Sequence, residues 1–162
     1  ILIPALLFFI GSPFIFGYAK PVPVDFGRLR KPKRDMAWVA LAGPASKLGQ
    51  ALLWGAGFVV LQGAGMQEPF FLGMCRAGVL VNVIMFVFNL FPLPPLDGGR
   101  IVTGLLPPKA AMTYSRVEPW GFFIVMGLVV AGVISNLWMR HLMSVTFSAL
   151  DAVLSPLAAL FR

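Results

Sequence analysis

The chain has 162 residues, of which 59% are hydrophobic and only 12% are charged, and its formal net charge is +7. An ordinary soluble domain carries roughly 25% charged residues, so this composition excludes a soluble globular surface over most of the chain. The basic residues lie at the edges of hydrophobic stretches and not on a patch with interleaved aromatics, which argues against nucleic-acid binding. We expect a lipid bilayer to surround a single domain, residues 1–162.

Hydrophobic stretches of membrane-spanning length recur along the sequence. A span needs roughly 20 apolar residues to cross a hydrocarbon core of about 30 Å. The stretches of suitable length are residues 1–19, 36–61, 77–96 and 119–139. A fifth segment, residues 142–161, carries Asp151 and Pro156 and is expected to be a short last span or an interfacial helix. The sequence therefore predicts an all-α polytopic membrane protein with about four to five transmembrane or interfacial helices.

The distribution of basic residues predicts the orientation of these helices. The segment Lys20–Asp35 holds six Lys or Arg residues and two acids, whereas Gln62–Pro69 holds no Lys or Arg. The positive-inside rule then places Lys20–Asp35 and Gly98–Glu118 in the cytoplasm and Gln62–Pro69 outside. Arg140 and His141 fall on the outer side in this arrangement. We expect a multi-pass protein of the bacterial inner membrane.

The segment Gly17–Val24 reads G-Y-A-K-P-V-P-V. Pro21 and Pro23 exclude a helix interior, and their alternation with valines predicts a short extended or edge-strand piece near the cytoplasmic side. An extended piece of this kind could accept an unwound peptide by strand addition. A stiff Pro-rich linker is the alternative, and the segment alone leaves both interpretations open.

The segment Val83–Arg100 reads V-I-M-F-V-F-N-L-F-P-L-P-P-L-D-G-G-R, so a hydrophobic helix meets three prolines and then Asp97. Asp-Gly-Gly after proline is by itself typical of a turn or a helix cap. A carboxylate at membrane depth, however, costs about 2.5 to 3.5 kcal/mol and usually marks a site. Asp97 is therefore a candidate metal ligand, and Asn89 either holds a substrate carbonyl or caps neighbouring backbone.

A run of small residues lies earlier, in A-L-A-G-P-A-S-K-L at Ala40–Leu48. Small side chains let a second helix approach closely, so helix packing is the main role expected for this run.

Four blocks together resemble the site-2 protease family of intramembrane zinc metalloproteases. They occur in the family's order within residues 17–100, a range that is about half of the chain: G-Y-A-K-P-V-P-V (Gly17–Val24), R-L-R-K-P-K-R-D-M (Arg28–Met36), A-G-P-A-S (Ala42–Ser46) and N-L-F-P-L-P-P-L-D-G-G-R (Asn89–Arg100). The last block is the most specific, and the ordered set is stronger than any block alone.

The resemblance implies a protease that hydrolyses peptide bonds in or near transmembrane segments of membrane-protein substrates. In that family an H-E-x-x-H motif supplies two His ligands and a Glu base for Zn²⁺, and by resemblance Asp97 is the third ligand. A catalytic zinc takes three protein ligands and keeps one position open for water. By the same resemblance Asn89 positions or polarises the substrate. The residues implied to lie near the substrate's path are Lys20, Pro21, Val22, Pro23 and Val24.

Two departures from the family pattern bear on this interpretation. The sequence has no H-E-x-x-H, its only histidine is His141, and it begins with Ile1. We interpret the chain as an N-terminally truncated domain that lacks the other ligands and is inactive alone. Lys47 stands where the family commonly has Asn and is expected to snorkel or to face a hydrated cavity.

Two other function classes remain as alternatives. The first is a catalytically inactive family member that acts as a membrane scaffold or binding partner. The second, a small transporter or channel subunit, is disfavoured because the sequence shows no internal repeat. The substrate's identity and the oligomeric state are not specified by these residues.

Overall fold

The computed structural model describes residues 32–161, and within this range every regular element is a helix. The elements are α2 (Pro32–Gly63), α3 (Pro69–Asn89), α4 (Asp97–Leu105), α5 (Pro108–Ser115), α6 (Glu118–Val130), the π-helix η2 (Ile134–Met139) and α7 (Arg140–Ala159). The predicted all-α class is thus confirmed for this part of the chain. The predicted first span and the Pro-rich piece at Gly17–Val24 lie outside the described residues.

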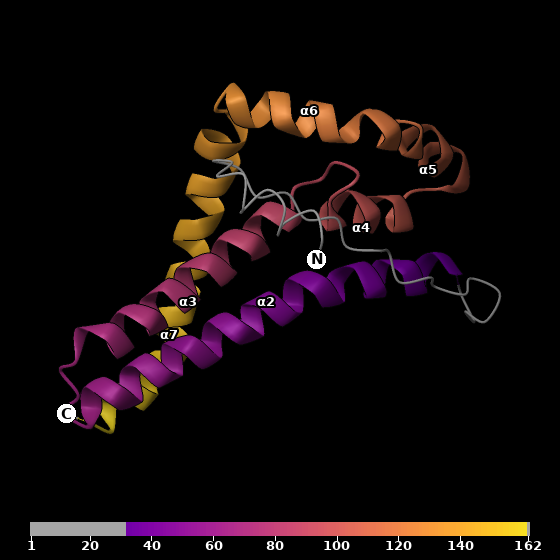
Figure 1. Ribbon diagram of the computed structural model, residues 1–162. Coiled ribbons are helices and arrows are strands. Elements are labelled where there is room, and N and C mark those ends of the chain that lie inside the picture. The colour runs from indigo at the N-terminus through magenta and orange to yellow at the C-terminus, as the bar shows by residue number, and fades with distance from the viewer. Residues whose placement is uncertain (1–31, 162) are drawn as a thin grey trace, which may run out of the picture.

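Three long helices, α2, α3 and α7, lie side by side, and the short helices α4 and α5 lie at one end of this bundle together with α6 (Figure 1). The buried centre consists of Ala51 from α2, Val83 and Val87 from α3, and Leu150 from α7. Small residues allow the close approach, since Gly78 of α3 lies directly against the Trp54 ring of α2. The bundle therefore positions the end of α3 and the start of α4 together.

Two stretches in the described range are long and apolar enough to cross a membrane: Pro69–Asn89, and the continuous η2–α7 helix over Ile134–Ala159. Both leave large apolar side chains exposed, including Phe70, Val81 and Val153. Exposed apolar surface of this kind suits contact with lipid. The total of four to five spans stays a prediction.

Two predicted spans have different boundaries in the structure. Helix α3 ends at Asn89, well before residue 96, because the prolines at 92, 94 and 95 lack the N–H that a helix interior needs. The predicted span over 119–139 does not form as one helix: α6 ends at Val130, and Gly132 adopts φ 72°, a conformation that glycine tolerates. With 13 residues, α6 is about 20 Å long, which is shorter than the hydrocarbon core.

Arg140 and His141 are the first two residues of α7, directly after η2. Trp138 Nε1 donates a hydrogen bond of 2.9 Å to the carbonyl oxygen of Val87, and its ring packs edge-to-face on Phe91. The start of α7 therefore lies against the end of α3. Arg140 and His141 lie toward this end of the bundle, the end that carries α4, and the side of the membrane on which they lie stays a prediction.

Candidate functional site

Asp97 is the first residue of α4. The N-cap residue is Leu96, in an extended conformation, and no side-chain hydrogen bond caps the helix. Asp97 therefore does not act as a hydrogen-bonding cap, although a negative charge in the first turn interacts favourably with the helix dipole. Its carboxylate is available for other contacts.

The carboxylate of Asp97 lies against Gly43 in α2. A Cβ atom added to Gly43 would be 2.9 Å from Oδ2 of Asp97. Gly43 belongs to the A-G-P-A-S block and Asp97 to the L-D-G-G-R block, so the fold brings these two separate blocks into contact. Lys47, one helical turn beyond Gly43, is half-buried on the same side of α2.

The segment 90–96 folds back over the start of α4, around a cis Pro94–Pro95 peptide bond. Gly98 and Gly99 are buried beneath it: a Cβ at Gly98 would overlap the Leu90 carbonyl, and one at Gly99 would overlap the backbone nitrogen of Pro94. Only glycine fits at both positions without a backbone shift. This packing holds the start of α4 against the end of α3.

Asn89, the last residue of α3, is half-buried. Asn89 directly precedes Leu90, and Asp97 directly precedes Gly98. Because the Leu90 carbonyl lies against the Cα of Gly98, the two candidate residues are each adjacent in sequence to this backbone contact. The structure thus brings the ends of their helices together. Their assignment to substrate positioning and to metal binding stays a prediction.

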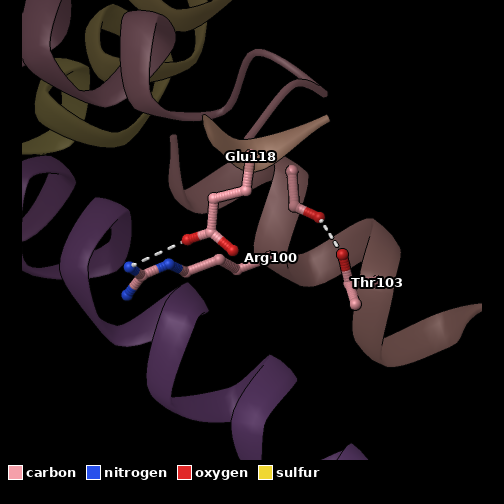
Figure 2. A network of polar contacts seen from close by, with 4 residues as sticks. Arg100, Thr103 and Glu118 are labelled. Atoms are coloured by element: carbon pink, nitrogen blue, oxygen red, sulfur yellow. Dashed lines mark hydrogen bonds and ion pairs between the residues drawn. The ribbon is translucent and has the colours of Figure 1, made fainter. Parts of the chain in front are cut away.

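Charges around the start of α4 are few. Partial burial raises the pKa of the Asp97 carboxyl above its ordinary value, and the positive charge of Arg100 opposes this rise. Arg100 also lies 3.9 Å from Glu118 of α6, and Figure 2 shows this ion pair beside Thr103, whose hydroxyl donates to the Gly99 carbonyl. Both charged side chains are about half exposed, so the pair contributes only about 0–1 kcal/mol.

Tyr114 of α5 makes a hydrogen bond to the backbone of the 90–96 loop. Its hydroxyl donates a hydrogen bond of 2.7 Å to the Pro92 carbonyl oxygen. We expect Tyr114→Phe to lower the free energy of unfolding by about 0.5–1.5 kcal/mol. Burial raises the pKa of this hydroxyl above its model-compound value of 10.0. The contribution is therefore full below pH 10.0 and is lost as the pH rises through the folded-state pKa, because only the protonated hydroxyl donates.

The test for Tyr114 compares chemical unfolding of the wild type and Tyr114→Phe at neutral and at high pH. The difference between the two proteins should shrink at high pH. A difference that is absent at neutral pH would contradict a stabilising hydrogen bond.

The described residues supply one candidate metal ligand and not a complete site. Within residues 32–161 no group of three or more His, Cys, Asp or Glu side chains is placed to hold a metal ion. His141 is exposed on α7. The chemistry of a carboxylate fits one zinc-ligand position, and the assignment of Asp97 to that position stays a prediction. The substrate segment predicted at Lys20–Val24 lies outside the described residues.

Several grooves lie on the described part of the chain, and two of them involve the long helices of the bundle and α4. The groove of about 520 Å³ between α2, α3 and α7 is largely apolar, carries Arg76 and Asp151, and does not include Asp97. The groove of about 290 Å³ lies between the start of α2 and α4, beside Trp38, Leu41, Ile101 and Leu105. Neither lining includes Asp97, but the second groove lies between α2 and α4, the helices that carry Gly43 and Asp97.

Sequence reasoning missed three contributors to this region. It assigned Gly43 mainly to helix packing, and it did not single out Tyr114 or Gly121, a buried glycine of α6 that lies against Pro94. Only Gly43 carried a sequence signal, since it lies inside the A-G-P-A-S block. The other two are defined by contacts between elements.

Comparison with known proteins supports the resemblance. Residues 66–132 match the model of the family described as peptidase family M50. The chain is 35% identical over 120 residues to "Putative zinc metalloprotease YwhC" of Bacillus subtilis, covering 71% of this chain and 55% of that protein. It is 32% identical over 109 residues to "Putative zinc metalloprotease Rip2" of Mycolicibacterium smegmatis, covering 67% of this chain and 41% of that protein.

A third relative is "Putative zinc metalloprotease Rip3" of Mycobacterium tuberculosis, 36% identical over 81 residues, which are 49% of this chain and 20% of that protein. The chain thus spans about half or less of the length of these relatives. No solved structure matches the chain. The matched family segment includes both Asn89 and Asp97. Over residues 66–132 the chain therefore matches peptidase family M50, the site-2 protease family.

Proposed function

We propose that the protein expressed from its complete gene is a zinc-dependent intramembrane endopeptidase. It hydrolyses peptide bonds in or near the transmembrane segments of membrane-protein substrates. The observation that carries the proposal is the position of Asp97, at the start of α4, half-buried, with Oδ2 beside Gly43 and without a capping hydrogen bond. The match to the M50 family model supports the class of reaction.

Asp97 holds one of the zinc ligand positions in this proposal. Because a catalytic zinc takes three protein ligands and leaves one position for water, the other ligands come from residues outside the described range. When bound, zinc lowers the pKa of its water to about 7 and polarises the scissile carbonyl. Asn89, at the end of α3, positions or polarises the substrate, and Lys20–Val24 lie near its path.

The proposal includes the membrane orientation. The helices α3 and η2–α7 cross the bacterial inner membrane, with Lys20–Asp35 and Gly98–Glu118 on the cytoplasmic side. The site then lies near the cytoplasmic edge of the bilayer, because α3 ends and α4 begins there. A substrate helix unwinds toward that edge to bring its peptide bond to the metal.

Removal of metal tests the proposal. The protein is purified from its complete gene in nanodiscs, its zinc content is measured, and cleavage of a panel of single-span membrane proteins is followed with and without a zinc chelator. We expect about one zinc per chain, loss of cleavage on chelation, and recovery when zinc is restored. Protein that contains no zinc and cleaves nothing would support the inactive scaffold instead.

A further inference from the structure

Gly121 and Val125 are the buried residues of α6, and most other side chains of this helix are exposed. The neighbours of Gly121 in α6, Trp120, Phe122 and Phe123, are exposed, with Trp120 at 68%. A Cβ atom at Gly121 would overlap the carbonyl oxygen of Pro94 and would lie 2.6 Å from the carbonyl carbon. Helix α6 therefore packs on the 90–96 loop through the Cα of Gly121, which carries no side chain.

The same part of the loop rests on α4. Pro94 is buried, and its backbone nitrogen lies in the space where a Cβ of Gly99 would be. A continuous line of contacts thus runs from Gly121 through Pro94 to Gly99, two residues after Asp97. These contacts involve backbone atoms, so an added methyl group cannot be accommodated by a change of side-chain rotamer alone.

A second link joins the same two helices. Glu118, three residues before Gly121, lies 3.9 Å from Arg100 of α4. Figure 1 shows that α6 runs across the end of the bundle, where α4 begins and α3 ends. The ion pair is exposed and weak, whereas the Gly121 contact is a close contact between the α6 backbone and the backbone of the loop.

We propose that Gly121 is a positioning residue for Asp97. Because it has no side chain, α6 packs directly on the Pro94 carbonyl, and this contact fixes the 90–96 loop and the first turn of α4. The effect on metal binding rests on the proposed function. The effect on the loop does not rest on the proposed function. Helix α6, which is too short to span the membrane alone, thus holds the 90–96 loop and the start of α4 in place.

The test compares Gly121→Ala with Gly127→Ala in the protein expressed from its complete gene. Gly127 lies on the same helix, and a Cβ there would meet nothing within 4 Å, so it controls for the glycine-to-alanine change itself. Hydrogen exchange is measured in nanodiscs for peptides that cover residues 90–100 and 69–89, and zinc affinity is measured by competition with a chelating dye.

For Gly121→Ala we expect faster exchange in residues 90–100, unchanged exchange in 69–89, and roughly 10- to 100-fold weaker zinc binding, as for loss of an outer-shell partner. Gly127→Ala should match the wild type. Unchanged exchange in 90–100, or equal changes in both variants, would overturn the proposal. Wild-type protein without zinc would refute the proposed function, while the exchange data would still decide the positioning role.

A measurement on the wild type covers the case in which Gly121→Ala does not fold. Within the 90–96 loop, Leu96 donates its backbone N–H to the Leu93 carbonyl oxygen at 3.0 Å. If α6 fixes this loop, the Leu96 amide exchanges as slowly as amides in the middle of α3. Rapid exchange of Leu96 in the wild type would overturn the proposal without any variant.

Discussion

Asp97→Asn is expected to abolish cleavage and to weaken zinc binding while leaving the protein folded. Asparagine has nearly the shape of aspartate, so it fits beside Gly43, where Oδ2 of Asp97 now lies. It lacks the negative charge that makes a carboxylate a good zinc ligand. The loss should exceed the roughly 10- to 100-fold that removal of an outer-shell partner costs, because here a ligand itself is replaced.

The stability of Asp97→Asn should change little. No capping hydrogen bond is lost, and the interaction of the charge with the α4 dipole is worth about 0.3–1 kcal/mol. Zinc content, cleavage and thermal unfolding are measured together, with Asp151→Asn as the matched control. Asp151 lies on α7 in the groove between α2, α3 and α7, which does not include Asp97, and its substitution should leave all three unchanged. Undiminished zinc and cleavage in Asp97→Asn would remove Asp97 from the metal site.

The helical class could be predicted because it depends on composition and on the lengths of apolar runs. The break after Asn89 was also predictable, since three prolines cannot continue a helix, although hydrophobicity alone extended the predicted span too far. The break at Gly132 was missed: a single glycine in an apolar run is a weak signal, and its φ of 72° depends on how α6 and η2 pack.

The candidate site, like the fold, could be predicted only in part from the sequence. Asp97 was identified from local chemistry, an acid in a Pro-Gly break, together with the family resemblance. The contacts around it join residues far apart in sequence, such as Gly43 with Asp97 and Gly121 with Pro94. Hydrophobic periodicity does not encode which glycine meets which backbone atom, so these contacts required the three-dimensional arrangement.

Gly43→Ala is expected to separate activity from stability. Alanine is favoured over glycine in a helix interior by about 1 kcal/mol, and Gly43 is exposed within α2. The added Cβ would lie 2.9 Å from Oδ2 of Asp97, the end of a rotatable side chain. The carboxylate can turn away at little cost in stability, but a catalytic group misplaced by about 1 Å can lose roughly 100-fold in rate.

The matched control is Gly49→Ala, on the same helix, where a Cβ would meet nothing within 4 Å. Both variants should unfold at or slightly above the wild-type temperature, and only Gly43→Ala should lose cleavage and zinc affinity. Equal activity in the two variants would contradict a role for Gly43 beyond packing. A loss confined to Gly43→Ala would mean that the A-G-P-A-S block acts on the site by setting the direction of one carboxylate, because the helix packing that the block also provides is the same in both proteins.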